Sequence, residues 1–433
     1  MRKLIFVLSL MLGCNLSVFA EKINWQMVEA QTLKNSPSVK SAKLTLDSAR
    51  QTHKGTSLST YLPRVSLTGT GRDLEWKSKD SQTSKALDGL GDRAPYSLGA
   101  NISVPLQPSA YDNIKGSCIA LKIAELNYKK SVSNAILESN KLYLNLIMAH
   151  EKLKMAERTK KRCIENKKFI TLKYHSGGTD IGQFKEVEAK VLAAERGLRR
   201  AQKHVKETSV DLLVAIGRDD IETILEVDEQ IIFPKKVIKE PDYNSLVTTI
   251  PEFLIAQYNF EKAKVSKRVA KNAWLPSVNL FGNYSPKVDS KWGVNFKDGN
   301  WSGGISLSYN IFTGFKRCYD LKIASNTFQT ASSEFLEKAD SLKREAERRY
   351  GGLVDVYEDM ETAKNDLELS ELRHKIAQEE YSKGLLEYDG WCLAEDEYEK
   401  AHAHLLSSKK DVGLRIAEWH NFTCDDLTKD KEE

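Results

Sequence analysis

The chain has 433 residues, of which 65 are lysine or arginine and 60 are aspartate or glutamate, giving a formal net charge of +5. The charges are spread along the chain without blocks, a pattern that does not imply binding to nucleic acid. The six cysteines include no CxxC pair, which argues against a disulfide framework and against a zinc site.

The first twenty residues have the organisation of a secretory signal peptide. Arg2 and Lys3 precede an apolar stretch, and Val18 and Ala20 lie where signal peptidase favours small residues. We therefore predict that residues 1–20 are removed. A competing cleavage before Cys14, which would leave a lipidated N-terminus, stays open. No later segment approaches the roughly 18 uninterrupted apolar residues of a membrane helix, so a membrane-spanning structure would have to use strands.

The chain contains an internal repeat. The segment Pro37 to Gly71 recurs as Pro251 to Tyr284, and Leu62-Pro63 in the first copy corresponds to Leu275-Pro276 in the second. Apolar residues recur every three or four positions before each of these prolines, which predicts amphipathic helices. They are Val39, Ala42, Leu46 and Ala49 in the first copy, and Phe253, Ala256, Phe260 and Ala263 in the second.

After each Leu-Pro pair the apolar period changes to two, which predicts strands. These strands cover Val65–Gly69 and Val278–Tyr284, and a second alternating run follows each at Leu98–Val104 and Ile305–Ile311. Strands of ~10 residues with one apolar face fit a transmembrane barrel, and a soluble sandwich edge is the alternative. Aromatic residues stand near the strand ends, namely Trp76, Tyr96, Tyr284, Trp301 and Tyr309.

Each strand pair is followed by about a hundred residues of helical pattern with one break at glycine. The predicted helices are Tyr111–Tyr174 and Phe184–Ile216 in the first half, and Tyr319–Tyr381 and Trp391–Trp419 in the second. A helix of ~63 residues is ~95 Å long, which requires a seam along which it can pack. Such stripes are present at Leu321, Phe328, Phe335 and Leu342, and at Ala394, Tyr398, Ala401, Leu405, Ser408, Val412, Ile416 and Trp419. We expect the second pair of helices to bury these stripes against each other.

The expected organisation has five parts. Residues 1–20 form the signal peptide, 21–218 the first repeat, 219–244 a connector packed around the helices, 245–420 the second repeat, and 421–433 a charged tail. The composition of the tail predicts that it is disordered. The fold class is therefore mainly α, with long antiparallel helical hairpins and four strands per chain.

Four strands cannot close a barrel, because even small barrels need about eight. Open edges cannot face lipid, since each unpaired backbone group there costs several kcal/mol. The chain must therefore oligomerise if it spans a membrane. A dimer would supply eight strands and a trimer twelve, and strand counting alone leaves both open.

Over nearly all of its mature length the chain resembles the TolC-like outer-membrane efflux proteins. The resemblance rests on Leu62-Pro63, on Leu275-Pro276, on the Tyr-Ser-x-Gly turn at Tyr381 to Gly384, and on the repeated order of elements. It implies a homotrimer in which twelve strands form a barrel in the outer membrane and the helices form a periplasmic tunnel. It also implies an inner-membrane transporter as partner, reached through a periplasmic adaptor (membrane fusion) protein. The duct itself would be passive and need no cofactor.

The resemblance also implies a gate at the helix turns, at the periplasmic entrance. Its candidate residues are Tyr381, Gly384, Glu387, Asp389, Gly177 and Asp180. The family arginine expected soon after Gly384 is replaced by Leu386, and the expected entrance acids fall on Gly390 and Leu393. A ring of acids facing the lumen would attract cations. The alternative is that these residues are ordinary solvated turn residues.

No catalytic constellation is recognisable, so we do not expect an enzyme. His402 and His404 are two residues apart on a predicted helix and face different directions, which makes them a poor metal pair. The competing function is a periplasmic adaptor or coiled-coil scaffold, which also uses long helical hairpins. The cargo, and the choice between drug efflux and type I secretion, stay open.

Overall fold

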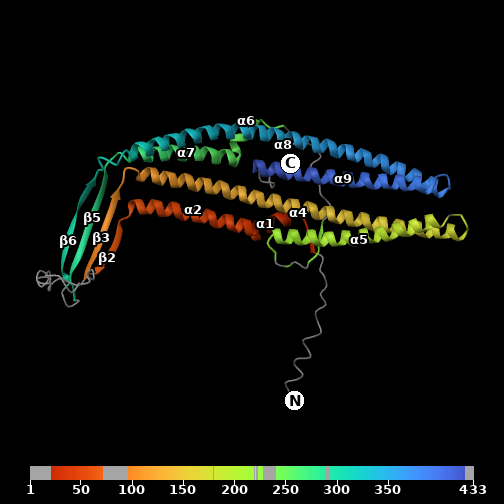
Figure 1. The fold of residues 1–433 in the computed structure, drawn as a ribbon, viewed down its shortest axis with the longest axis horizontal. Coiled ribbons are helices and arrows are strands. Elements are labelled where there is room, and N and C mark those ends of the chain that lie inside the picture. Colours follow the sequence, from red (N-terminus) through yellow and green to blue (C-terminus); the bar gives the residue numbers. More distant parts are fainter. Residues whose placement is uncertain are drawn as a thin grey trace, which may run out of the picture. The chain divides into compact units, whose positions relative to one another are not determined.

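The computed structural model describes residues 21–71, 96–178, 180–218, 220, 223–227, 240–288 and 293–424. Within these residues the chain is mainly helical, with two strand hairpins, and this confirms the predicted fold class (Figure 1). Because residues 1–20 and Trp76 lie outside the described residues, the signal peptide and that aromatic position stay predictions.

The elements follow the same order in the two halves of the chain. The first half contains α1 (Trp25–Asn35), α2 (Pro37–Tyr61), β2 (Arg64–Gly71), β3 (Tyr96–Leu106), α4 (Ala110–His175) and α5 (Ile181–Ala215). The second contains α6 (Tyr243–Thr249), α7 (Pro251–Asn272), β5 (Ser277–Val288), β6 (Val294–Ser308), α8 (Lys316–Ser382) and α9 (Tyr388–Thr423). The predicted bounds of the long helices therefore agree with the observed ones to within four residues, and α5, α8 and α9 each begin three residues earlier than predicted.

Contacts divide the chain into two compact units that cut across the two repeats. Unit 2 comprises Leu44–Leu126 and Glu252–Asp340, and unit 1 comprises the other described residues. Each unit therefore contains matching segments from both halves of the sequence.

Unit 2 contains a four-stranded antiparallel sheet in the order β2-β3-β5-β6. The two hairpins meet where β3 pairs with β5, for example Ile102 with Gly282 and Val104 with Leu280. The helices of unit 2 pack through aromatic pairs, because the centroids of Phe253 and Phe335 are 5.3 Å apart. Phe260 and Phe328 are also 5.3 Å apart.

The seam predicted between α8 and α9 is present along the part of α8 that belongs to unit 1. There Leu353 and Tyr357 of α8 pack against Val412 of α9, with Ile416 beside them. Further towards its N-terminus, α8 packs its phenylalanines on α7 instead. The expectation that the whole stripe from Leu321 packs on the return helix is therefore wrong for its first part, because α7 covers that part.

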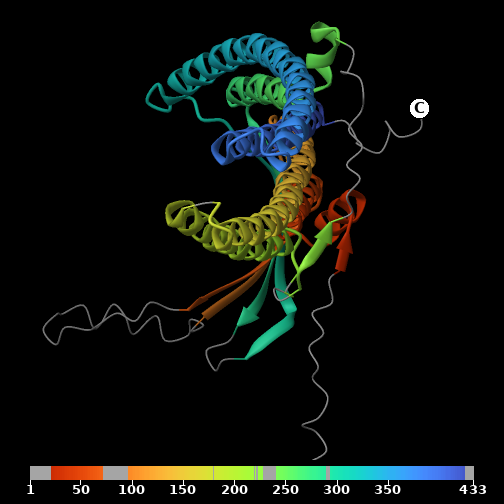
Figure 2. The same cartoon turned by 90° about the vertical axis from the view of Figure 1, so that its right-hand side faces the viewer.

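The core of unit 1 includes a two-stranded parallel pair that the sequence reasoning missed. β1 (Glu21–Ile23) pairs with β4 (Leu225–Val227), and Figure 2 shows the two strands side by side. Ile23 and Leu225 are fully buried against Leu146 and Leu212 of the long helices. Strands of three residues are too short to carry an apolar period, so no sequence signal marked them.

A glycine lets α5 end close to α1. Gly217 has φ +74°, and a Cβ built there would lie 2.5 Å from the carbonyl oxygen of Asn35. A side chain at this position would therefore meet both a left-handed backbone and a clash.

The connector and the tail are described only in part. Residues 228–239, which include Pro234, lie outside the described residues, whereas Leu225–Val227 belong to β4. α9 continues to Thr423, so the first three residues of the expected tail are helical, and residues 425–433 lie outside the description. None of the described helices is both long and apolar enough to cross a membrane.

Candidate gate at the helix turns

Two turns with the same backbone join the long helices of unit 1. Gly177 has φ +74° and Gly384 has φ +75°, and each follows the last residues of a long helix. Gly178 donates its N–H to the carbonyl of Lys173 at 2.8 Å, and Leu385 donates to Glu380 at 2.9 Å. These bonds close the helix ends in the Schellman arrangement, which places glycine at the left-handed position.

The predicted acids begin the return helices. Asp180 is the N-cap of α5, and its carboxylate accepts the N–H of Gln183 at 2.8 Å. Glu387 is the N-cap of α9 but makes no side-chain cap bond. Both acids are exposed. Among the described residues no hydrogen bond or ion pair joins Asp180 to Glu387, so the structure does not bring the predicted acids together.

The last candidate acid and the two positions where the family pattern expects acids lie in the first two turns of α9. Asp389 belongs to the first of these turns, but its side chain is outside the described residues. A Cβ at Gly390 would lie 2.8 Å from Cδ1 of Leu386. A side chain at position 390 would therefore require the side chain of Leu386 to move. Leu393 is 61% exposed.

Tyr381 is half-buried in an apolar cluster that all four long helices of unit 1 build. Its ring lies 5.7 Å from Phe169 of α4 and 5.4 Å from Trp391 of α9, centroid to centroid. Among the described residues its buried hydroxyl has no hydrogen-bond partner. We call this set the tip cluster: Ile170, Phe184, Val187, Tyr381, Tyr388, Trp391 and Cys392.

The two tyrosines of the tip cluster have raised pKa values. Burial raises the pKa of Tyr381, and the neighbouring Cys392 adds to the effect. Burial is also the main cause that raises the pKa of Tyr388, and the hydrogen bond with Cys392 is the second cause. Both effects favour the neutral phenol in the folded protein.

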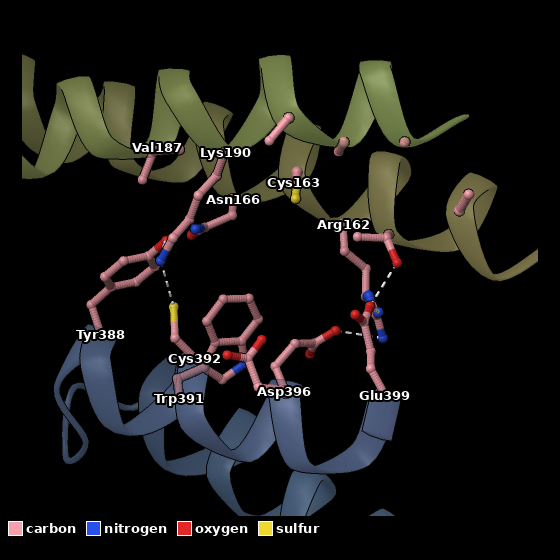
Figure 3. Close-up of a pocket in the computed structure, with 16 residues that line it drawn as sticks. Arg162, Cys163, Asn166, Val187, Lys190, Tyr388, Trp391, Cys392, Asp396 and Glu399 are labelled. Carbon is pink, nitrogen blue, oxygen red and sulfur yellow. Dashed lines mark hydrogen bonds and ion pairs between the residues drawn. The ribbon is translucent and has the colours of Figure 1, made fainter. Parts of the chain in front are cut away.

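Lys190 connects α5 to α9 beside the cluster. Its Nζ lies 2.9 Å from Glu186, 3.2 Å from the hydroxyl of Tyr388 and 3.4 Å from the sulfur of Cys392. Burial acts to lower the pKa of Lys190, but the bonds to Glu186 and Tyr388 outweigh it and raise that pKa. Figure 3 shows Lys190 reaching across a cavity of about 440 Å³ towards α9.

An ion-pair network at the other end of this cavity joins α4, α8 and α9. Arg162 of α4 pairs with Glu395 at 2.5 Å and with Glu399, both on α9 (Figure 3). His374 of α8 donates from Nε2 to the second oxygen of Glu395 at 2.7 Å. We call Arg162, His374, Glu395 and Glu399 the clasp. Burial and the carboxylate of Glu399 raise the pKa of the adjacent Cys163 thiol.

Sequence reasoning did not find the clasp. The family resemblance predicts an arginine just after Gly384. The arginine that pairs with α9 is instead Arg162 of α4, more than two hundred residues earlier in the chain. The helical spacing of Glu395 and Glu399, which puts both on one face, was the available signal.

The long paired helices, the four-stranded sheet and the two matched turns together define a fold that can be compared with those of known proteins. Residues 29–218 match the family described as outer membrane efflux protein. The resemblance to TolC-like outer-membrane efflux proteins is thereby confirmed. No curated protein matches the sequence.

Solved structures share the fold at low sequence identity. CusC is 15% identical with a TM-score of 0.76, covering 92% of this chain and 91% of that chain. The CmeC outer membrane channel of Campylobacter jejuni is 16% identical with a TM-score of 0.74, covering 94% and 88%. The open-state MtrE outer membrane channel of Neisseria gonorrhoeae is 16% identical with a TM-score of 0.73, covering 92% and 88%. At this low sequence identity, the similarity shows a shared fold and nothing more.

Proposed function

We propose that the protein is a subunit of an outer-membrane exit duct that conducts substrate passively out of the cell. The observation that carries the proposal is the division of the sheet into an apolar and a polar face. Strand pairing puts Val278 beside Leu307 and Leu280 beside Ile305 on one face, and Asn279 beside Ser306 on the other. The apolar face is exposed, since Ile305 and Leu307 are 72% and 68% accessible.

The same division continues across the first hairpin. Val65 pairs with Ile102 on the apolar face, and Ser66 pairs with Asn101 on the polar face. An exposed apolar face opposite a polar one is the pattern of a barrel with lipid outside and water inside.

The outer strands support oligomerisation. Neither β2 nor β6 has a further partner strand among the described residues. Their free edges would be paired by the edges of neighbouring copies, because unpaired backbone groups are costly in lipid. The family resemblance favours three copies and twelve strands over two copies and eight. The oligomer would sit in the bacterial outer membrane, with its helices forming a tunnel in the periplasm.

We place the gate at the turns of unit 1, with Tyr381, Gly384, Glu387, Asp389, Gly177 and Asp180 around the entrance. The tip cluster and the clasp hold the α4–α5 and α8–α9 hairpins together just behind these turns. Opening would separate the hairpins, so it would break the contacts of Tyr381 with Phe169 and of Arg162 with α9. An adaptor and an inner-membrane transporter would supply the energy, in a tripartite efflux or type I secretion system.

Paired substitutions on the two faces of β6 test the barrel. Ile305→Lys places a charge on the apolar face and should cost about 2–4 kcal/mol in lipid. Ser306→Lys, the adjacent residue on the polar face, is the control and should be tolerated. Recovery of folded oligomer from the outer-membrane fraction is the measurement.

A soluble scaffold or adaptor makes the opposite prediction, because both residues would then face water and neither lysine would matter. Recovery of the wild-type chain in the soluble periplasm would contradict the duct, as would a folded oligomer that never conducts ions in planar bilayers.

A further inference from the structure

A second cavity lies in unit 1, away from the turns. It has a volume of about 350 Å³ and is bounded by α1, by the middle of α4 and by the last turns of α9. Its apolar wall comes from Leu33, Val132, Ile136, Leu137 and Ala417. A volume of this size is in the range of small-molecule sites.

Asn140, a residue in the wall of this cavity, has a buried amide oxygen without a donor among the described residues. Asn140 is 1% exposed, and its Nδ2 donates to Oε1 of Glu29 at 3.3 Å. That bond fixes the amide, because a flip would turn Oδ1 against the carboxylate. Among the described residues Oδ1 of Asn140 has no hydrogen-bond partner. A buried carbonyl of this kind requires a donor from elsewhere.

Two further acceptors line the same cavity. The Oδ1 of Asn421 is also buried without a partner among the residues that the structure describes. Glu29 supplies a carboxylate, one oxygen of which also accepts the indole N–H of Trp25 at 2.8 Å. Two amide oxygens and one carboxylate therefore belong to residues that line the same cavity.

We propose that this cavity is a binding site for a small organic ammonium ion with an apolar body. A primary ammonium group has three N–H donors and a positive charge, which match two amide oxygens and the Glu29 carboxylate. The apolar wall accommodates the body of the ligand. Lys129 also lines the cavity, but its side chain is exposed and lies on the solvent side.

Three probe molecules of similar shape distinguish recognition of the positive charge from simple occupation of an apolar cavity. The thermal unfolding midpoint of the full chain in mild detergent is measured with benzylammonium, benzyl alcohol or benzoate at equal millimolar concentration. We expect benzylammonium alone to raise the midpoint, by about 2 °C or more at concentrations well above its Kd. Isothermal titration calorimetry then gives its affinity.

Substitutions test the residues. Asn140→Leu keeps the shape but removes the amide, and should weaken benzylammonium binding at least tenfold, as one charge-assisted hydrogen bond implies (about 1.4 kcal/mol). Asn166→Leu, the same change at the cavity beside the tip cluster, should leave binding unchanged. If Asn140→Leu does not fold, Glu29→Gln and Asn421→Leu provide the same test at half-buried positions.

Three results would overturn the proposal. Absence of stabilisation by benzylammonium would mean that water alone serves Asn140. Equal stabilisation by benzyl alcohol would mean a merely apolar cavity, and preference for benzoate would mean that Lys129 dominates the site. The proposal does not depend on the exit duct, because the wild-type chain can conduct ions whether or not it binds benzylammonium.

Discussion

The two turns of unit 1 share a backbone but differ in what their side chains contact. The first turn has Tyr174, Gly177 and Asp180 at the same spacing as Tyr381, Gly384 and Glu387 in the second. Tyr174 stacks on Phe184 of its own hairpin at 5.2 Å, whereas Tyr381 also contacts Phe169 of the other hairpin. The two repeats therefore have the same turn geometry, whereas the contact with the other hairpin is made by Tyr381 of the second turn. We infer that the second turn and the clasp couple the hairpins.

The largest effect is expected where α9 is tied to α4. Arg162→Ala would remove the guanidinium that pairs with Glu395 and Glu399, whose side chains are 13% and 32% exposed. Loss of these bonds should lower the free energy of unfolding by about 2–3 kcal/mol and raise channel open probability. Urea denaturation and planar-bilayer recording are the measurements.

The control for Arg162 is Arg373→Ala. Arg373 pairs with Glu397 of α9 at 3.9 Å, but its side chain is 62% exposed. A surface pair of this kind contributes about 0–1 kcal/mol, so little change is expected. Equal effects of the two substitutions would contradict the role given to the clasp.

Next in size is the comparison of the two tyrosines. Tyr381→Ala removes a ring between hairpins and should cost about 2 kcal/mol, less than a fully buried aromatic residue would, while increasing conductance. Tyr174→Ala removes a ring within one hairpin, so stability should fall without an increase in conductance. If both variants conduct alike, the second turn has no special role in coupling.

The strands and the helix turns could be predicted from the sequence, whereas the clasp and the β1–β4 pair could not. The strands after Pro63 and Pro276 and the turns at Gly177 and Gly384 follow from local rules, because proline and glycine act on the backbone nearby. The clasp could not be predicted, since Arg162 meets α9 only through tertiary packing. The β1–β4 pair was missed because its strands are too short to show a period.

Alkaline pH should weaken the tip cluster in a predictable direction. The pKa values of Tyr381 and Tyr388 are raised on folding, so their contribution is fully present below the unfolded pKa of about 10. It is lost as the pH rises further, because the unfolded chain then releases its protons first. Tyr388→Phe should reduce the fall in unfolding midpoint between about pH 9 and pH 11. A fall as steep as that of wild type would contradict the assignment.

The two glycines should respond equally. Neither Gly177 nor Gly384 has an atom within 4 Å of a built Cβ, so only the positive φ opposes a side chain. Alanine at either position should cost about 1 kcal/mol through the left-handed backbone. Equal losses in urea denaturation would support a turn geometry common to both repeats, and a much larger loss at Gly384 would show that the second turn is constrained by more than its backbone.

The smallest effect distinguishes the two N-caps. Asp180→Ala removes the bond to Gln183 and should cost about 1 kcal/mol, whereas Glu387→Ala removes no cap bond and should be nearly neutral. Glu387→Asp shortens the side chain to the length that caps α5, so it should stabilise α9 by a few tenths of a kcal/mol or more. The same variant keeps the negative charge at the turn. Reduced cation conductance in Glu387→Ala but not in Glu387→Asp would therefore separate a lumen-facing charge from a merely structural cap, and unchanged conductance in both would assign Glu387 to the solvated surface of the turn.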